Sequence, residues 1–531
     1  MNKYITVMAP YPSGSSLHCG HYYNYAIVDS YCKIQKYQGH EVFQPFSYDS
    51  FGLPTENYAI KIGRDVTEVS LENIESFRHQ MEKMNTSFEE KFTTSSSDFI
   101  KKSQWLFSKL LEHGLAYKAE QEQCYCPSCK TILANEQVKN TKIVNGLPLD
   151  GVCERCSTPI EAKKMNQWFL KITDYAERLI NDLDKVDYPE KIKKQQKHWI
   201  GKSEGYEIDF GNGIICFTTK PETLPFVDFI VVPLQDDGIE KQIGSIKHPL
   251  KDIEIPIWTA DYVIKGYGTA YVMGVPRDDK RDASFSIRHN IPSYISEDSK
   301  DLINIREFNF IKPKTNYRLR DWSVSRQRKW GCPIPVEGET DTLDTFFDTA
   351  HYLIQYDKTR PVDIYVGGGE HACTHLIYYR FITKFLYDIG YIDFDEPVKY
   401  LINQGIILAE DGERMSKTRG NVINPISYDP QLLRMFMMFI NHYFEGGKWQ
   451  DAGYKGCERF RNKLMTWLNS ASEETDEIDF DKFEKIVINY FESWKTNKVV
   501  SEWMIFFNAN KGKKISINTS EKIKKFFNTC F

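Results

Sequence analysis

The order of apolar and polar positions at the start of the chain predicts a strand–helix–strand unit. An apolar run at residues 4–8 has the length of a strand, and a loop rich in Pro, Ser and Gly follows it. Helical spacing then runs from about Gly20 to Gln38, with Gly39 as a plausible C-cap. A second strand is expected at residues 41–46. Such units place loop residues at the carboxyl ends of parallel strands, where ligands bind.

The rest of the chain alternates between helical and β-rich stretches. Helical spacing is expected over residues 71–118, 166–202 and 450–531, and short β-rich runs dominate residues 206–312. The α/β pattern resumes after residue 316, with strands expected at 363–366 and near 398–402. We therefore expect an α/β protein with a parallel sheet, an inserted β-rich domain and a helical C-terminal portion.

Length, composition and charge narrow the class of protein. A chain of 531 residues is too long for one hydrophobic core, and about three or four domains are expected. No apolar run of about 18 residues is present, so no membrane span is expected. The N-terminus lacks the apolar region of a signal peptide, which makes the cytoplasm the expected compartment. A net charge of −5 gives no overall support for nucleic-acid binding, which would require a local basic patch.

Four of the twelve cysteines form two Cys-x-x-Cys pairs, Cys126 with Cys129 and Cys153 with Cys156. Disulfides are rare in cytosolic chains, so paired cysteines there indicate metal binding. Two pairs separated by 23 residues match a tetrahedral zinc site. Four thiolates leave no open coordination position, and the zinc is therefore expected to be structural.

Three separate motifs point to a phosphate-binding site. In PYPSGSSLHCGH, His18 and His21 share a face of the first helical turn, where backbone N–H groups and the helix dipole favour an anion. Gly20 removes a side chain between them. A glycine-bounded loop at residues 413–421 carries cations around a serine, and residues 366–375 read as strand, glycine loop and helix. All three fit one edge of a parallel sheet, which suggests a nucleotide site.

These motifs resemble those of a known family. HxGH after PYPSG, paired with an MSK loop, resembles class I aminoacyl-tRNA synthetases, and DSFGLPTEN at residues 49–57 is similar to the DAFGLPAEN of leucyl-tRNA synthetases. Further similar segments are ANEQV at 134–138, QWFLKITDY at 167–175, WIGKSEG at 199–205 and YRLRDW at 317–322. The similarity runs in order from residue 3 to about 465.

The resemblance implies a reaction and a set of residues. Such enzymes use ATP and Mg²⁺ to activate leucine, or a similar aliphatic amino acid, and charge tRNA(Leu), and they often carry zinc at the position of the cysteine pairs. The implied catalytic residues are His18, His21, Arg414, Ser416 and Lys417. Met8, Tyr11, Asp49, Phe346, Tyr365, His371 and His375 would bind the amino acid, with Asp49 pairing with its ammonium group. Gly20, Gly367, Gly368, Glu370 and Lys417 would bind ATP.

The sequence departs from the family pattern near the amino-acid site and in the inserted domain. The PYPSG loop is one residue longer, and Tyr48 and His351 replace tryptophans. The inserted domain resembles the family's editing domain but is shorter, with the gap between Val232 and Lys247, so its hydrolytic activity is left open. Its editing-like residues are Thr218, Thr219, Thr223, Asp279 and Asp282.

We expect six consecutive segments in a monomer. They are the first half of a Rossmann-type catalytic domain (1–120), a zinc module (121–162), a return to the catalytic domain (163–204), a reduced editing-like domain (205–313), the second catalytic half with the RMSKT loop (314–440), and a truncated helical domain resembling an anticodon-binding bundle (441–531). The leading hypothesis for function is charging of tRNA(Leu). The alternatives are a free-standing paralogue that delivers an aminoacyl adenylate to another acceptor, and a non-catalytic regulatory paralogue.

Overall fold

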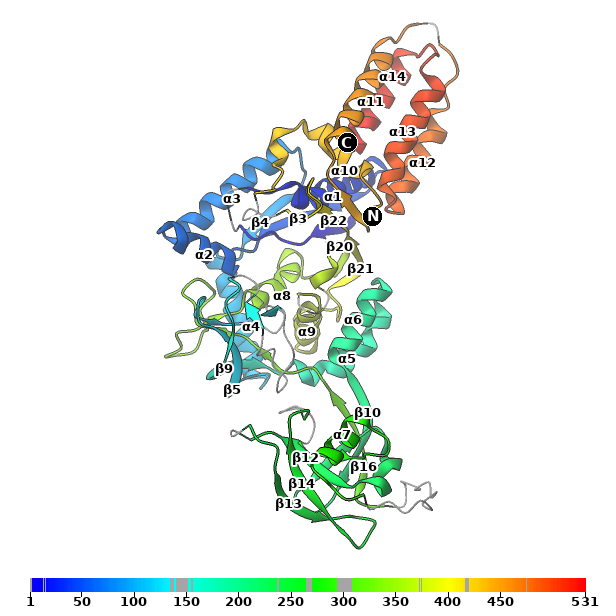
Figure 1. The fold of residues 1–531 in the computed structure, drawn as a ribbon. Coiled ribbons are helices and arrows are strands. Elements are labelled where there is room, and N and C mark those ends of the chain that lie inside the picture. The colour runs from blue at the N-terminus through cyan, green and yellow to red at the C-terminus, as the bar shows by residue number, and fades with distance from the viewer. Residues whose placement is uncertain are drawn as a thin grey trace. The chain divides into compact units, whose positions relative to one another are not determined.

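The computed structural model forms two compact units (Figure 1), of which unit 1 comprises Met1–Lys109, Asn181–Gln195 and Lys329–Phe531, and unit 2 comprises Leu110–Ile180 and Gln196–Arg328. The structure describes residues 2–12, 14, 16–133, 138–139, 151–153, 156–235, 238–263, 270–293, 308–371, 373, 375–415, 420–473 and 475–531. Among these residues, no helix has both the length and the apolar character needed to cross a membrane.

A parallel four-stranded sheet forms the centre of unit 1, as the pattern of the sequence predicts. Its order is β2 (Glu41–Phe43), β1 (Asn2–Val7), β20 (Val362–Gly368) and β21 (Val398–Gln404). Each neighbouring pair is parallel, with Ile5 opposite Ile364 in one ladder. Ile5 and Val7 are fully buried, as expected for a sheet covered on both faces. Parallel order brings the carboxyl ends of these strands to one edge.

The first helix follows the prediction closely, whereas the second strand does not. Helix α1 is Cys19–Tyr37, within one residue of the expected span at each end. The strand expected at residues 41–46 is divided into β2 and β3 (Pro45–Tyr48), and β3 pairs with β4 (Glu89–Thr93). Pro45 has no backbone N–H to donate, which favours a break at this point.

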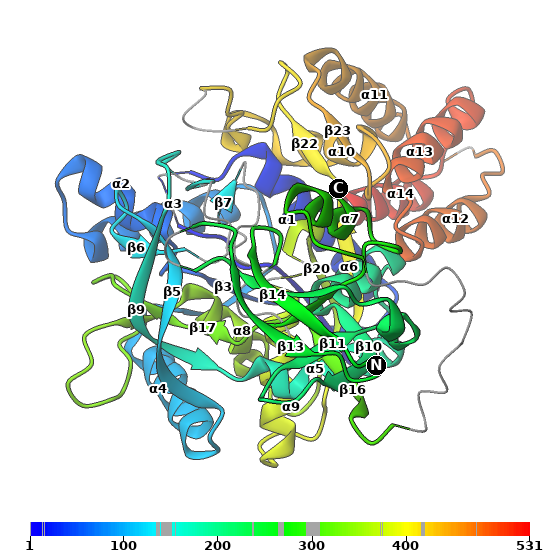
Figure 2. The ribbon, with the colours of Figure 1, turned by 60° about the horizontal axis from the view of Figure 1, so that its bottom comes forward.

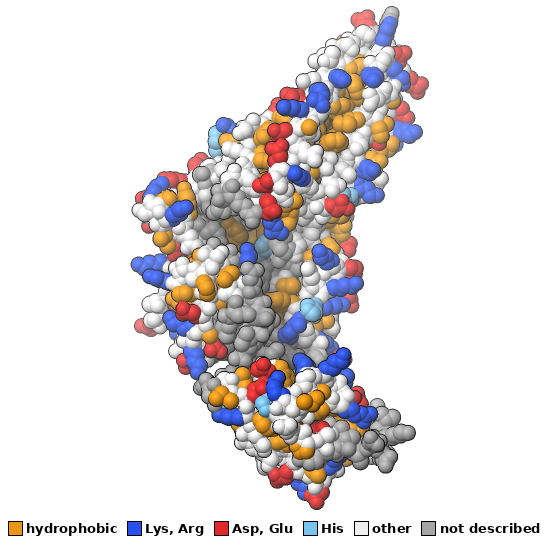
Figure 3. Space-filling view, in the orientation of Figure 1, with side chains coloured by type: hydrophobic (Ala, Val, Ile, Leu, Met, Phe, Trp, Pro, Cys, Tyr) orange, Lys and Arg blue, Asp and Glu red, His pale blue; other side chains and the backbone are white. Residues whose placement is uncertain are grey.

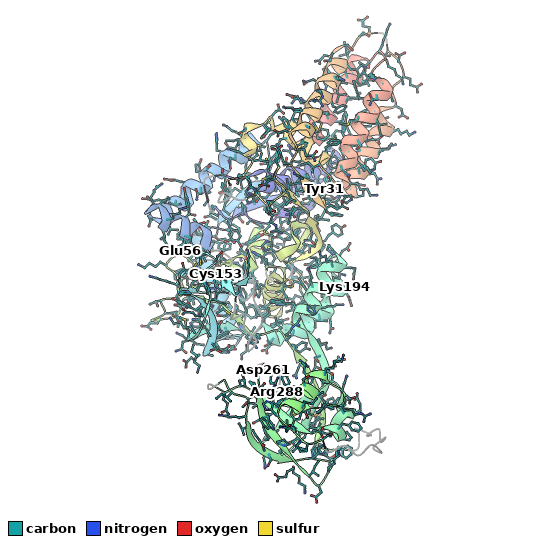
Figure 4. All side chains as sticks on the ribbon, in the orientation of Figure 1. Tyr31, Glu56, Cys153, Lys194, Asp261 and Arg288 are labelled. Atoms are coloured by element: carbon teal, nitrogen blue, oxygen red, sulfur yellow. The ribbon has the colours of Figure 1, made fainter. Side chains whose placement is uncertain are left out.

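Helices around this sheet join it to a C-terminal bundle within one hydrophobic core. The remaining elements of unit 1, with α4 reaching into unit 2, are α2 (Leu53–Ile62), α3 (Val66–Lys83), α4 (Ser97–Glu112), η3 (Asp182–Lys185), β19 (Thr342–Leu343), α8 (Thr345–Tyr356), η6 (Gly369–His371), α9 (His375–Asp388), β22 (Ile406–Leu408), η7 (Pro425–Ser427), α10 (Pro430–Phe439), β23 (Gly446–Lys448), α11 (Asp451–Asn469), α12 (Phe480–Glu492), α13 (Thr496–Asn510) and α14 (Ile517–Cys530). Tyr31 of α1, labelled in Figure 4, stacks on Trp494 at 4.6 Å between ring centroids. Arg434 and Asp29 form a buried ion pair at 2.5 Å between α10 and α1.

Unit 2 begins with long antiparallel strands that carry the cysteine module. Its strands β5 (Ala116–Cys126) and β9 (Glu161–Leu170) pair along their length, and β6 (Thr131–Ile132) and β17 (Trp322–Ser323) flank them. The helical spacing predicted from residue 166 is wrong up to Leu170. Four consecutive residues at the end of β9 are buried, and such a run cannot be distinguished from a buried helix by its periodicity. The other elements of this part are β7 (Val138–Lys139), β8 (Val152–Cys153), η2 (Ile172–Tyr175) and α5 (Ala176–Asn181), with α6 (Glu190–Ile200) shared between the units and β18 (Ser325–Arg326) near the end of unit 2.

The inserted part of unit 2 is β-rich, as predicted (Figure 2). One sheet has the order β11 (Ile215–Thr218), β10 (Lys202–Asp209) and β16 (Ile311–Tyr317). The other has the order β13 (Gln242–Lys247), β14 (Glu254–Ala260), β12 (Phe229–Pro233) and β15 (Val272–Gly274), and η4 (Pro221–Phe226) and α7 (Lys280–Arg288) complete the domain. Ile208, Leu224 and Ile230 belong to its separate hydrophobic core.

Charged side chains of both signs are scattered over the face that Figure 3 presents, in keeping with a net charge of −5.

Candidate active site

The two histidines of the HxGH motif cap the N-terminus of α1. The backbone N–H of Gly20 donates to Nδ1 of His18 at 3.1 Å, and the N–H of His18 donates to Nδ1 of His21 at 3.3 Å. The two ring centroids lie 3.9 Å apart. A Cβ on Gly20 would lie 2.9 Å from the His18 ring, so a glycine is needed for this packing. Because each Nδ1 accepts, the proton of each neutral ring is on Nε2, which makes both rings donors suited to phosphate oxygens.

The carboxyl ends of β1 and β20 bring further predicted residues to the same edge of the sheet. The N–H of Met8 donates to the carbonyl of Val366 at 3.0 Å, and a Cβ on Gly367 would lie 3.1 Å from Met8 Cε. Gly368 ends β20, and Gly369 begins η6. These contacts join the segment after β1 to the glycine loop, two of the three segments that the motifs predict at this edge.

Asp49 lies directly after β3 and is buried. Its backbone N–H donates to the carbonyl of Pro10 at 3.0 Å, and Thr345 Oγ1 donates to Asp49 Oδ1 at 2.9 Å. The carboxylate is 1% exposed. A carboxylate in such a place is costly unless hydrogen bonds and a cation compensate its charge, and a substrate ammonium group is a suitable cation.

Tyr11, Phe346, His371 and His375, four of the predicted amino-acid-binding residues, form one cluster in unit 1. The His375 ring makes edge contacts with Phe346 and with His371, each at 4.7 Å between centroids. Tyr11 Oη lies 3.4 Å from His375 Nε2. Burial, and secondarily the nearby His371, hold the pKa of His375 well below its usual value. The His375 ring is therefore neutral where it packs against the other aromatic rings of the cluster.

Tyr365 is placed differently from the other predicted amino-acid-binding residues. Its hydroxyl lies 3.0 Å from the hydroxyl of Tyr352, its ring contacts Tyr379, and its side chain is 1% exposed. These are contacts of a packed core position behind the cluster. Burial raises the pKa of Tyr365, so its hydroxyl stays protonated.

A cavity of about 720 Å³ opens in unit 1 at the carboxyl end of β21. Its lining includes Lys191, Ile192, Gly369, Asn403, Gln404 and Arg414. The side-chain oxygens of Asn403 and Gln404 are buried and have no hydrogen-bond partner among the described residues. Neither residue was predicted from the sequence. A polar pair directly after the buried strand at 398–402 is the signal that could have indicated them.

Part of the predicted phosphate-binding set lies outside the described residues: Ser416, Lys417 and the side chain of Glu370. Arg414, which precedes this loop, is described. It bridges to Leu408, and its carbonyl accepts from Asn421 Nδ2 at 3.2 Å. Arg414 is also among the residues that line the cavity, as is Gly369 of the glycine loop.

Four of the five editing-like residues form hydrogen bonds within the inserted domain. Thr218 Oγ1 accepts from the N–H of Lys220 at 3.0 Å, Thr223 Oγ1 donates to the Lys220 carbonyl at 2.7 Å, and Thr219 is exposed. Asp279 caps α7, and Asp282 accepts from the Tyr262 hydroxyl at 2.9 Å and from the Val275 N–H at 2.8 Å. Burial raises the pKa of Asp282.

Arg277, two residues before Asp279, contacts the end of η4: its guanidinium carbon lies 4.0 Å from the ring centroid of Phe226.

The four paired cysteines lie together in unit 2. Sγ of Cys126 is 3.4 Å from that of Cys156, and Sγ of Cys129 is 3.6 Å from Cys156 and 4.0 Å from Cys153, which Figure 4 labels. All four sulfur atoms lie within 4.8 Å of one another. Tetrahedral zinc with bonds of about 2.3 Å separates its sulfur ligands by about 3.8 Å, so this donor set fits zinc.

Two family models match parts of the chain. The model described as tRNA synthetases class I (M) matches residues 3–208, and the model described as leucyl-tRNA synthetase, editing domain, matches residues 235–307.

Curated relatives align with nearly the whole chain. A leucine–tRNA ligase of Clostridium perfringens is 36% identical over 649 aligned positions, covering 94% of this chain and 78% of the relative. One from Caldanaerobacter subterraneus is 37% identical and covers 88% of this chain and 74% of the relative.

Solved structures share the fold. The agnB2 LeuRS of Agrobacterium radiobacter, in a ternary complex with tRNA and LeuAMS, has a TM-score of 0.83 at 28% identity and covers 96% of this chain and 81% of that one. Methionyl-tRNA synthetase of Mycobacterium tuberculosis has a TM-score of 0.58 at 16% identity, covers 96% of this chain and 83% of its own, and shares the fold only.

Proposed function

Because the chain belongs to the leucyl-tRNA synthetase family, as its motifs indicated, we propose that it activates leucine with ATP and transfers the leucyl group to tRNA(Leu). The observation that carries this proposal is the histidine pair at the N-terminus of α1, in which each Nδ1 accepts a backbone N–H and each neutral ring therefore has its proton on Nε2. Arg414 lines the neighbouring cavity.

In the first step, a carboxylate oxygen of leucine attacks the α-phosphorus of ATP. An O–P bond forms, the bond to the oxygen that bridges the α- and β-phosphates breaks, and pyrophosphate leaves. Negative charge accumulates on the phosphate oxygens in the transition state, so fixed donors and cations lower the barrier. His18, His21 and the first turn of α1 supply donors, Gly20 leaves room for the nucleotide, and Arg414 supplies a cation.

By their resemblance to the family motif, Lys417 and Ser416 would also stabilise the charge on the ATP phosphates. Mg²⁺, held mainly by the ATP phosphates, would neutralise part of their charge. On the glycine loop, the backbone of Gly367 and Gly368 and the side chain of Glu370 would contact the adenosine.

The amino acid would be bound at both ends. Asp49, oriented by Thr345, would pair with the leucine ammonium group. Met8, Tyr11, Phe346, His371 and His375 would surround the side chain, and Tyr365 would support them from the core. In the second step, a hydroxyl of the terminal ribose of tRNA attacks the leucyl carbonyl carbon, and AMP leaves.

The cysteine cluster is proposed as a structural zinc site. Cys126, Cys129, Cys153 and Cys156 would hold the ion, which would fix the turns of the module.

Transfer to tRNA is tested with the purified chain, ATP, radiolabelled leucine and total tRNA. We expect leucine-dependent ATP–pyrophosphate exchange and acid-precipitable label on tRNA. Exchange without label on tRNA would contradict charging and favour a paralogue with a different acceptor. Absence of both would contradict the proposed function as a whole.

A further inference from the structure

Polar groups on the amino-acid side of unit 1 form one continuous chain. Tyr11 Oη lies 3.4 Å from His375 Nε2, and His375 Nδ1 lies 3.0 Å from Thr349 Oγ1. Thr349 Oγ1 lies 3.2 Å from the carbonyl oxygen of Phe346. Thr349 and His375 are 1% and 2% exposed. This series of hydrogen-bonded groups joins the loop after β1, the start of α9 and the middle of α8, three segments that are distant in sequence.

The directions of these hydrogen bonds follow from the chemistry of the groups. A carbonyl oxygen can only accept, so the single hydroxyl proton of Thr349 is given to Phe346. The Thr349 oxygen then accepts from His375, which requires the proton on Nδ1. A neutral imidazole has one ring proton, so Nε2 accepts from Tyr11. In the alternative, Thr349 donates its one proton to His375 Nδ1, and the Phe346 carbonyl keeps only its helical hydrogen bond; the tautomer of His375 distinguishes the two arrangements.

We propose that Thr349 is a positioning residue, which keeps the ring proton of His375 on Nδ1 and thereby directs the hydroxyl proton of Tyr11 toward His375 rather than toward the substrate. This inference rests on the proposed function, because it assigns Tyr11 and His375 to the leucine side chain. The hydroxyl protons of Tyr11 and Thr349 are then both donated to protein atoms. Neither residue offers a hydrogen-bond donor to a polar substrate side chain. The site then favours an aliphatic amino acid over a polar one of the same shape, such as asparagine.

Removing the Thr349 hydroxyl is expected to move the ring proton of His375 from Nδ1 to Nε2. In Thr349→Val the Nδ1–H of His375 loses its acceptor, and a buried unpaired donor favours transfer of the ring proton to Nε2. Nε2–H then faces Tyr11, whose hydroxyl proton becomes available to other groups. We expect the KM for leucine in ATP–pyrophosphate exchange to rise about tenfold with kcat changed less than twofold, and discrimination against asparagine to fall.

The experiment compares Thr349→Val, Thr349→Ser and the control Thr383→Val. Thr383 is also fully buried and donates to a helix carbonyl, that of Tyr379 at 2.6 Å, but among the described residues its side chain makes no hydrogen bond with an imidazole. The kinetic readout is KM and kcat for leucine. The second readout is the tautomer of His375 in protein labelled with ¹⁵N-histidine, from long-range ¹H–¹⁵N correlations assigned by their loss in His375→Gln.

The inference expects an Nδ1–H tautomer of His375 in the parent and in Thr349→Ser, with the kinetic change confined to Thr349→Val. It is overturned if the parent shows Nε2–H, or if Thr349→Val behaves as Thr383→Val does. If Thr349→Val does not fold, the tautomers of the parent and Thr349→Ser decide. A parent without leucine-dependent exchange refutes the proposed function, while its His375 tautomer still decides the role of Thr349.

Discussion

The ring proton of His375 is assigned to a different nitrogen from that of His18 and His21, because the hydrogen-bond partners of the rings differ. In His18 and His21 each Nδ1 accepts from a backbone N–H, so the proton of each neutral ring is on Nε2. In the proposed arrangement of His375, Nδ1–H donates to Thr349 Oγ1, and Nε2 accepts from the Tyr11 hydroxyl. The first arrangement suits an anion, and the second suits an apolar side chain.

Recognition of these residues from the sequence depended on local motifs. His18, Gly20 and His21 stand together in the chain, so a short pattern indicates them. Thr349 was not predicted because tertiary packing alone brings it to the site, and the only local sign of Asn403 and Gln404 is their polar pair at the end of an apolar strand. The sequence shows that His351 replaces a tryptophan, but no local pattern shows that it is buried or that Ser103 Oγ lies 3.0 Å from its Nε2.

His351 gives a prediction for pH dependence. Burial, with a smaller effect of Lys102, lowers the pKa of His351 to about 3, whereas the unfolded chain has an ordinary histidine pKa of about 6.5. The unfolded state therefore binds a proton that the folded state does not as pH falls below about 6.5, and stability falls by about 1.4 kcal/mol per pH unit between the two values.

The check is urea unfolding of the parent and His351→Gln between pH 7 and 5, with the exposed His79→Gln as control. The slope of the free energy of unfolding against pH should correspond to about one proton fewer in His351→Gln than in the parent, and it should be unchanged in His79→Gln. An equal slope in parent and His351→Gln would contradict a buried neutral imidazole.

At the scale of elements, prediction succeeded where one periodicity dominates. The strand at residues 4–8 and the helix from Gly20 were predicted almost as β1 and α1 lie, because turn residues separate them. The strand at 41–46 was interrupted by Pro45, and the end of β9 was read as helix because it is buried on both faces. Both errors come from tertiary pairing, which the local pattern does not show.

The contact between β22 and β23 depends on two glycines. A Cβ on Gly405 would lie 1.9 Å from the backbone nitrogen of Gly446. Gly405→Ala should therefore force the strands apart and lower the free energy of unfolding by about 1–3 kcal/mol. Gly456 lies within α11, where an added Cβ would be 3.8 Å from a guanidinium nitrogen of Arg459, so Gly456→Ala should raise the free energy of unfolding by about 0.5–1 kcal/mol.

Thermal or urea unfolding of the two glycine variants beside the parent measures this difference. Equal stability of Gly405→Ala and the parent would show that the close approach of the strands is not required.

At the scale of the whole molecule, the sequence allows a prediction of the order of segments because each carries its own signal. The cysteine module, the β-rich insertion and the C-terminal helices differ in composition and periodicity, and the family matches cover residues 3–208 and 235–307. The grouping into two units was not predicted. It depends on which segments pack together, as Asn181–Gln195 does with unit 1.

The cysteine module gives a prediction about metal content. Chain purified without chelator should contain about one zinc ion, because four sulfur atoms are gathered at distances that suit it. Cys126→Ala should lose the ion, whereas Cys124→Ala should retain it, since Cys124 is a buried neighbour outside the four-sulfur cluster. Elemental analysis by mass spectrometry measures both. A parent without zinc, or full zinc in Cys126→Ala, would contradict the assignment.

The most direct test of the account is ATP–pyrophosphate exchange with each of the twenty amino acids, in the parent, His18→Ala, His21→Ala and the exposed control His79→Ala. We expect leucine to support the fastest exchange, each active-site variant to lose about 10²–10³ in rate with little change in melting temperature, and the control to match the parent. No exchange with any amino acid, or parental rates in both His18→Ala and His21→Ala, would contradict the claim that these histidines stabilise the charge of a transferring phosphate.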